Sequence, residues 1–317
     1  MSMNVAGMIG NERIAGRVKS AVGSGRVSHA YIFDGPSGIG KTTAANFFAK
    51  SLQCPRPDMS SRAIYCGTCP SCRSFDGGNH PDVFYPVPTK TKFLGVDDVR
   101  EQVVAAARVK PYAYPYKIYI LENADATSAA AQNALLKILE DPPEYCVFML
   151  LANSSAAFLP TVISRCVLMR LVPLPEETLR LELEKRGTPD ADIYAAHAQG
   201  LLGRALKLAG SENFRVMRDE MTGLADGIER MELDRVFAQF STLEKYKSQI
   251  QDALEILLLY YRDRLTADTG AVSKRLADFD AIVQAKDALR HNANFQLAME
   301  VLLIKLSGVR AREGTAE

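Results

Sequence analysis

The stretch GPSGIGKT, from Gly35 to Thr42, decides the fold of this chain. It matches the pattern G-x-x-x-x-G-K-[ST] of a phosphate-binding loop, and it stands between the apolar run Tyr31–Phe33 and the helix-forming stretch Thr43–Ser51. A loop of this kind joins a strand to a helix, so the sequence predicts an α/β domain. A plain glycine-rich turn is the alternative, but such a turn requires neither the lysine nor the threonine at its end.

Each part of this loop has a physical reason to bind a nucleotide. The glycines let backbone N–H groups curl around the β-phosphate, and the start of the following helix adds a partial positive charge. Lysine reaches the β/γ oxygens and the threonine hydroxyl can ligate Mg²⁺. The loop residues that we expect to bind nucleotide are Gly35, Gly38, Gly40, Lys41, Thr42 and Thr43.

Hydrolysis requires a metal-holding carboxylate at the end of a neighbouring strand and a group that activates the attacking water. The apolar run Lys117–Leu121 leads into Glu122 and Asn123, where a hydrolysing protein usually has Asp and then Glu. An asparagine amide can orient a water but cannot take its proton. Asp125 lies farther along and is an alternative carboxylate. The sequence therefore predicts ATP and Mg²⁺ binding, with Glu122 as part of the site, and little or no hydrolysis.

Four of the six cysteines are clustered with the spacing C-x11-C-x2-C-x2-C. Thiolates at this spacing can converge on one ion, which predicts a closed, structural Cys₄ Zn²⁺ site in a module of about residues 54–75. Free buried thiols and an iron–sulfur cluster are the alternatives. Pro55, Pro57 and Pro70 favour a compact loop rather than a helix through the ligands. The expected ligands are Cys54, Cys66, Cys69 and Cys72.

Apolar, β-rich runs alternate with helix-like stretches as far as about residue 171, which predicts a mostly parallel sheet covered by helices. Beyond Pro173 the pattern is helical throughout. We expect three domains: a nucleotide-binding domain over 1–172, a small lid of three helices over 173–209, and a helical domain over 210–317. The expected strands are Ala30–Phe33, Val83–Val87, Lys117–Leu121, Val147–Leu151 and Val167–Leu171.

The composition excludes several classes of protein. With 38 Lys+Arg against 37 Asp+Glu in 317 residues, the net charge is +1, so any contact with nucleic acid requires a local patch or an assembly. No apolar run approaches the roughly 18–20 residues that cross a bilayer, and Met1–Lys19 lacks the apolar stretch of a signal peptide. We therefore expect a cytoplasmic protein without a membrane partner.

Three further motifs identify a family resemblance. NALLKILEDPP (Asn133–Pro143), SHAYIF (Ser28–Phe33) and Ser164-Arg165-Cys166, together with the phosphate loop and the cysteines, resemble bacterial clamp-loader subunits of the AAA+ class over about the first 210 residues. The resemblance implies an AAA+ domain with a zinc-binding insertion, a helical lid and an all-α collar that holds subunits together. It also implies a place in the DNA polymerase III holoenzyme, with gamma/tau and delta subunits, the sliding clamp and, through the assembly, primed DNA as partners.

The resemblance also assigns roles to single residues. Arg165 corresponds to an arginine finger that acts in trans on the ATP site of the adjacent subunit; a surface salt bridge is the alternative. Asn153 matches the sensor region, where a polar side chain touches the γ-phosphate, and a strand-end cap is the alternative. Gly203 stands where the ATPase subunits carry an arginine.

Three functions follow from these observations. The first is a scaffold-like clamp-loader subunit that holds zinc and ATP, supplies Arg165 to a neighbour and helps to load the clamp onto primed DNA. The second is a hydrolysing gamma/tau-type ATPase that uses Glu122 and Asp125. The third is an unrelated P-loop protein whose zinc loop contacts nucleic acid. The lack of interleaved basic and aromatic residues around Cys66–Cys72 argues against the third function.

Overall fold

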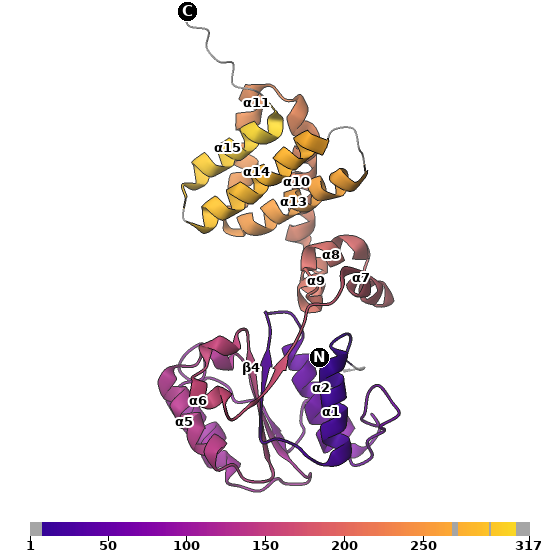
Figure 1. Ribbon diagram of the computed structural model, residues 1–317, viewed down its shortest axis with the longest axis vertical. Helices are drawn as coiled ribbons and strands as arrows, with labels where there is room; N and C mark the ends of the chain where they lie inside the picture. Colours follow the sequence, from indigo (N-terminus) through magenta and orange to yellow (C-terminus); the bar gives the residue numbers. More distant parts are fainter. Residues whose placement is uncertain (1–7, 268–271, 292, 309–317) are drawn as a thin grey trace, which may run out of the picture. The chain divides into compact units, whose positions relative to one another are not determined.

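The computed structural model describes residues 8–267, 272–291 and 293–308. The chain divides into two compact units (Figure 1). The first comprises the residues up to Glu182 together with Gln199–Arg204, and the second comprises Leu183–Ala198 and the residues from Ala205 onward. The finer division into three domains, with a separate lid over 173–209, stays a prediction.

The first unit is built on a parallel five-stranded sheet, so the predicted α/β fold is confirmed. The edge strand β2 ends at Phe84, short of the expected Val87, because Pro86 has no N–H with which to continue the ladder. The strand order is β2-β3-β4-β1-β5. The strands are β1 (Ala30–Asp34), β2 (Val83–Phe84), β3 (Lys117–Leu121), β4 (Cys146–Ala152) and β5 (Val167–Arg170).

Both faces of the sheet are buried, and alternate residues of each strand belong to different halves of the core. In β1, Tyr31 and Phe33 pack with the helices on one face, whereas Ala30 and Ile32 pack with those on the other. This arrangement explains why the central strands are almost continuously apolar. It also places the C-terminal ends of β1, β3 and β4, where the candidate site residues follow, along one edge of the sheet.

Helices cover the two faces in separate groups (Figure 1). One face carries α1 (Glu12–Ser24), α2 (Lys41–Gln53) and α3 (Pro70–Asp76). The other carries α4 (Val96–Asp98), the π-helical η1 (Val99–Ala105), α5 (Ala129–Glu140) and α6 (Pro160–Ile163). The short 3₁₀ turns η2 (Ala124–Ala126) and η3 (Ser155–Ala157) follow β3 and β4.

The second unit is helical. In helix α13 (Ile250–Ala267), Leu254, Leu257 and Tyr261 are buried and form part of the core of this unit. Among the described residues, no helix combines the length and apolar character that a membrane span requires. The helices after β5 are α7 (Glu176–Lys185), α8 (Ala191–Ala198), α9 (Leu202–Ala209), α10 (Glu212–Gly227), η4 (Ile228–Arg230), α11 (Leu233–Ala238), α12 (Phe240–Lys245), η5 (Lys247–Gln249), α13 (Ile250–Ala267), α14 (Val272–Arg290) and α15 (Phe295–Ser307).

Candidate nucleotide and metal sites

The phosphate loop connects β1 to α2 as expected. Gly38 and Gly40 adopt φ values of 84° and 104°, which disfavour residues with a Cβ atom, and Gly40 is the N-cap of α2. Gly35 N donates to Ala152 O at 3.2 Å, which ties the start of the loop to the end of β4. The fold therefore presents a loop and a helix N-terminus in the arrangement that suits a phosphate group.

The side chain of Lys41 spans the loop. Its Nζ donates to Gly35 O at 2.6 Å, to Pro36 O at 3.1 Å and to Asn153 Oδ1 at 2.9 Å. Desolvation by burial lowers the pKa of Lys41, while the nearby carboxylates of Asp125 and Asp34 oppose that shift. The structure thus brings together the expected lysine and the expected sensor residue, which lie 112 positions apart in the sequence.

The two expected metal-binding side chains also meet. Thr42 Oγ1 donates to Glu122 Oε1 at 3.2 Å, although one begins α2 and the other follows β3. Thr43 is exposed in the first turn of α2. Asn123 is exposed and has φ 49° and ψ 40°, a left-handed conformation that asparagine tolerates better than most residues. The conformation gives a physical reason for asparagine at this position.

Asp125 is engaged in a structural contact. Its Oδ2 accepts hydrogen bonds from Asn153 N at 2.8 Å and Ser154 N at 3.3 Å. Its Oδ1 is buried without a hydrogen-bond partner among the described residues. The carboxylate therefore holds the backbone after β4 in place, at the residue whose side-chain Oδ1 accepts from Lys41 Nζ.

Gly203 packs directly on the phosphate loop. Its N donates to Gly38 O at 2.9 Å, and a Cβ atom added at position 203 would lie 2.9 Å from that oxygen and 3.0 Å from Gly38 Cα. Any side chain here requires the two backbones to move apart. The absence of arginine, noted from the sequence, therefore has a steric reason that the sequence did not reveal.

A cavity of about 440 Å³ adjoins Thr42 and Glu122, and sequence analysis did not predict it. Its other walls come largely from the apolar segment around Tyr85 and Phe93. Tyr85 Oη donates to Asn46 Oδ1 at 2.7 Å, and burial, with a smaller effect of the Glu122 carboxylate, raises the pKa of Tyr85 to about 12. The space beside the Thr42–Glu122 pair is thus bordered by apolar groups.

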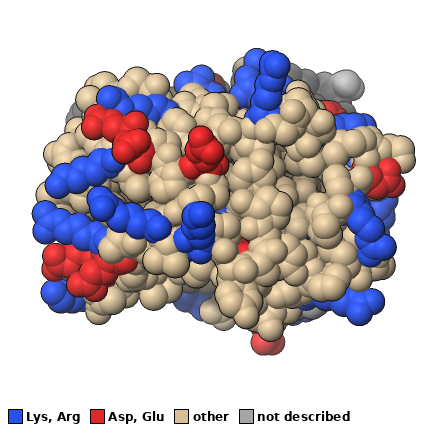
Figure 2. All heavy atoms as spheres, turned by 90° about the horizontal axis from the view of Figure 1, so that it is seen from below, with Lys and Arg blue, Asp and Glu red and all other residues tan. Residues whose placement is uncertain are grey.

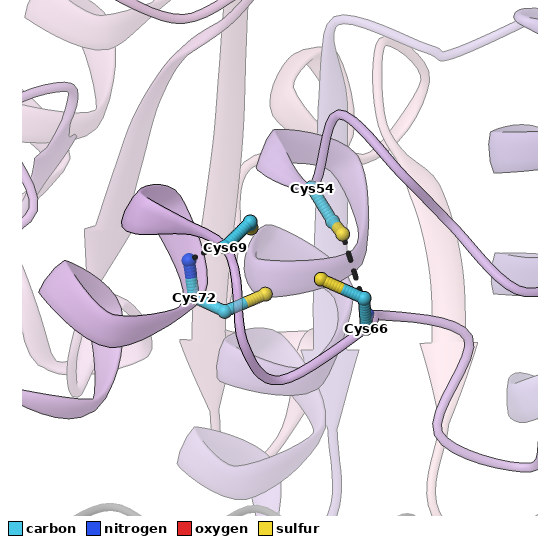
Figure 3. A group of neighbouring side chains, drawn as sticks. All are labelled: Cys54, Cys66, Cys69 and Cys72. Atoms are coloured by element: carbon cyan, nitrogen blue, oxygen red, sulfur yellow. Dashed lines mark hydrogen bonds between the residues drawn. The ribbon is translucent and has the colours of Figure 1, made fainter.

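The four clustered cysteines point toward one another (Figure 3). All four sulfur atoms lie within 4.8 Å of one another. Sulfurs bound at about 2.3 Å to one tetrahedral ion lie roughly 3.8 Å apart, so a small contraction is enough to form such a site. Three of the cysteines are buried and Cys66 is partly exposed. The donor set and its geometry fit a Zn²⁺ ion.

The local structure of the cluster differs from the expected compact loop. Pro70 is the first residue of α3, and Cys72 lies within that helix, so the prediction of a helix-free module is wrong. Proline is well tolerated at this position, because the first N–H groups of a helix have no partner within it. The Cys69 sulfur supplies the cap by accepting from Cys72 N at 3.4 Å.

Backbone donors and burial act on the thiols in opposite directions. Backbone hydrogen bonding from Thr68 lowers the pKa of Cys66 to about 5, whereas burial raises the pKa values of Cys54 and Cys72. Cys66 N donates to Cys54 Sγ at 3.3 Å. Lys50 on α2, whose side chain is only 2% exposed, pairs with Asp76 at 2.5 Å and so fixes the end of α3 to α2.

Arg165 lies between α6 and β5, and its side chain is 35% exposed. Its Nη2 pairs with Glu140 Oε1 at 2.9 Å, and its Nη1 donates to Thr161 O at 2.9 Å. The ion pair is the contact that the alternative interpretation predicts. A guanidinium has five N–H donors, so this pair and a contact to another subunit are compatible.

The chain is similar to known proteins over both of its units. The family model "DNA polymerase III, delta subunit" matches residues 10–175. "DNA polymerase III subunit delta'" of Bacillus subtilis is 27% identical over 320 residues, which cover 93% of this chain and 95% of that protein. The protein of the same name in Pseudomonas aeruginosa is 30% identical over 309 residues, covering 89% and 93%. "DNA polymerase III subunit tau" of Escherichia coli is 28% identical over 313 residues, covering 97% of this chain but 46% of that protein.

Proposed function

Because the chain belongs to the delta' family of DNA polymerase III clamp-loader subunits, we propose that it binds ATP with little or no hydrolysis and completes the nucleotide site of a neighbouring subunit. The proposed partners are gamma/tau and delta subunits, the sliding clamp and, through the assembly, primed DNA. In this role the chain assists clamp loading without driving it by its own turnover. The bonding of Asp125 is the observation that carries the non-hydrolysing role.

The alternative, a hydrolysing gamma/tau-type subunit, needs Glu122 and Asp125 for metal and water. Asp125 Oδ2 instead accepts two backbone N–H groups from the segment after β4, and moving it would leave both donors without that partner. Asn123 stands at the position of the usual base and cannot take a proton. These two facts favour binding over turnover.

Nucleotide binding is supported by the loop itself. Lys41 and Thr42 lie at the start of α2, beside Asn153 and Glu122 respectively, in positions that suit phosphate and Mg²⁺. ATP has to replace the carbonyl contacts of Lys41 with its own oxygens. This exchange predicts weak to moderate affinity rather than tight binding.

The cysteine cluster supports a structural Zn²⁺ as the second ligand of the chain. Cys54, Cys66, Cys69 and Cys72 fill four coordination positions, so no open position is left for a substrate or a reactive water. The ion would join the end of α2, the connecting loop and α3. We assign it to stability of this module.

Arg165 is the proposed contribution to the neighbour. Its partial exposure and its position between α6 and β5 support a role across a subunit boundary, where a guanidinium stabilises charge on the transferring phosphoryl group. The motif Ser164-Arg165-Cys166 of the resemblance carries the assignment to a finger.

The charge of this chain alone gives no strong attraction to DNA, so we assign the contact with DNA to the assembly. The net charge is +1. On the face in Figure 2, Lys and Arg are interspersed with Asp and Glu around a broad uncharged area of the described residues. Such a face gives little long-range attraction to phosphate.

The test is the ATPase rate of the purified chain, alone and with its gamma/tau and delta partners, alongside calorimetric titration with ATP and Mg²⁺. We expect binding, its loss in Lys41→Ala, and near-zero turnover by the chain alone. Asn123→Glu should not restore turnover, because the neighbour's finger is absent and the left-handed backbone disfavours glutamate. Robust turnover by the chain alone would establish the alternative, and no binding at millimolar ATP would contradict the proposed nucleotide site.

A further inference from the structure

The guanidinium of Arg165 is held by its own chain before any partner is present. Glu140 binds it on one side at 2.9 Å, and Thr161 O accepts from it on the other at 2.9 Å, with a longer contact to Ser164 Oγ at 3.5 Å. We propose that Glu140 is a positioning residue, which fixes the Arg165 side chain in the orientation that meets the neighbour's nucleotide. This inference rests on the proposed finger role of Arg165.

The backbone around this pair is fixed by the packing of α5 on the segment that carries Arg165. Gln132, near the start of α5 and only 3% exposed, accepts from Leu159 N at 2.8 Å and donates to Ala157 O at 3.2 Å. Glu140 makes the second attachment at the last residue of the same helix. Buried Leu135 and Val162 belong to the core between them. Helix α5 therefore contacts residues 157–165 at both of its ends.

The position of Glu140 is electrostatically unusual. A carboxylate at the C-terminal end of a helix faces the negative end of the helix dipole, and a nearby guanidinium offsets that repulsion. The side chains of Arg165 and Glu140 are 35% and 54% exposed, and ion pairs this exposed contribute little to stability. Stability is thus a weak reason for a carboxylate here, whereas orientation of the guanidinium is a sufficient one.

The contacts within the chain leave part of the guanidinium for another molecule. Nη1 donates to Thr161 and Ser164, and Nη2 pairs with Glu140, whereas Nε–H has no hydrogen-bond partner among the described residues. Holding one edge of the planar group fixes the direction of the remaining donors. A side chain ordered in advance loses less freedom when subunits dock, and small misplacements of catalytic groups are costly to rate.

The experiment uses the complete clamp loader with clamp and primed DNA, reconstituted with Glu140→Ala, Glu140→Gln, Arg165→Ala or the double variant Glu140→Ala/Arg165→Ala. We expect Glu140→Ala to lower the ATPase kcat of the complex by roughly ten-fold with little change in KM. Glu140→Gln keeps an oxygen acceptor and should retain most of the rate. In the Arg165→Ala background, Glu140→Ala should cause no further loss, because the group that it positions is gone.

Glu144→Ala is the matched control, because it removes an exposed carboxylate four positions along the chain. Melting temperature and subunit assembly are measured for every variant, so that a folding defect is distinguished from a positioning defect. If Arg165→Ala slows the complex while Glu140→Ala matches or exceeds the wild-type rate, the positioning role is wrong and the finger stands. A further loss from Glu140→Ala in the Arg165→Ala background also overturns it. If Arg165→Ala itself runs at the wild-type rate, the proposed function fails first.

Discussion

Helix α2 begins at the phosphate loop and ends beside the cysteine cluster, and the two ends differ in how completely the chain supplies their chemistry. At the C-terminal end, four sulfur donors from one stretch of about twenty residues lie within 4.8 Å of one another. At the N-terminal end, Lys41 and Thr42 depend on side chains that follow β3 and β4. The first site is local and closed, whereas the second is assembled from distant segments.

This difference separates two kinds of inference. A closed set of four thiolates restricts what it binds, because ligand type and tetrahedral geometry favour Zn²⁺ or an iron–sulfur cluster over hard cations. A phosphate loop defines only that a phosphate binds, since turnover depends on a metal-holding carboxylate, a water-activating group and an arginine. In this chain the water-activating position holds Asn123, and Arg165 is proposed to serve another subunit. The same helix therefore joins a self-sufficient site to one whose function depends on the assembly.

The largest expected effect concerns this dependence on the assembly. Arg165→Ala should lower the ATPase and clamp-loading rates of the reconstituted complex by roughly 10³-fold or more, as arginine fingers do in phosphoryl-transfer enzymes. Arg165→Lys should fail as well, because an ammonium lacks the planar fork. Rates are measured in parallel with zinc content and subunit assembly.

Folding and zinc content of the Arg165 variants should be unchanged, because the lost ion pair is worth only about 0–1 kcal/mol. Clamp loading at the wild-type rate by Arg165→Ala would reduce Arg165 to a surface ion-pair residue. That result would also remove the proposed contribution of this chain to a neighbouring subunit, because Arg165 would then play no part in the neighbour's nucleotide site.

The second effect tests whether the cysteine cluster at one end of α2 is independent of the phosphate loop at the other end. Cys69→Ser removes a direct ligand and should weaken zinc binding by more than the roughly 10–100-fold typical of changes behind the ligands. The module around α3 should loosen while the sheet stays folded, since neither the strands nor the phosphate loop includes these residues. Elemental analysis gives the zinc content, and circular dichroism with limited proteolysis reports the module.

Cys166→Ser is the control for this variant, because Cys166 lies outside the cluster. It should keep one zinc per chain. Wild-type protein without stoichiometric metal under reducing conditions would refute the zinc assignment. A simultaneous loss of ATP binding in Cys69→Ser would show that α2 couples its two ends, in place of the independence inferred from their separate donors.

The sequence predicted the features that depend on short-range patterns. The phosphate loop, the cysteine spacing and the central strands are each written in contiguous or closely spaced residues, and the parallel sheet follows from their alternation. The expected strand Val83–Val87 is too long, because Pro86 cannot donate to the ladder. The expectation of a compact loop through the ligands fails at Cys72, because Pro70 occupies the first position of α3, where proline is well tolerated.

The features that escaped prediction depend on three-dimensional proximity. Nothing in the sequence around Asp125 indicates that its carboxylate accepts from Asn153 N, and no local pattern pairs Glu140 with Arg165. The first contact joins segments that follow β3 and β4, whereas the second joins the end of α5 to the segment before β5, at the opposite edge of the parallel sheet. The left-handed backbone of Asn123 is similarly visible only in the structure, although asparagine before a short turn is a weak signal for it.

The smallest expected effect concerns the backbone contact between Gly203 and the phosphate loop. Gly203→Ala places a Cβ atom 2.9 Å from Gly38 O, and it should lower the free energy of unfolding by about 1–3 kcal/mol, as overpacking does elsewhere. Gly223→Ala is the matched control, because this glycine is exposed within α10 and a Cβ atom there meets nothing within 4 Å. The control should instead gain up to about 1 kcal/mol from helix propensity. Chemical denaturation of both variants measures the difference, and equal stabilisation by the two would show that Gly203 does not press on the loop. In that case the lack of an arginine at 203 would have no steric cause. Gly203→Arg would then test whether an arginine from the same chain can complete the nucleotide site at the phosphate loop.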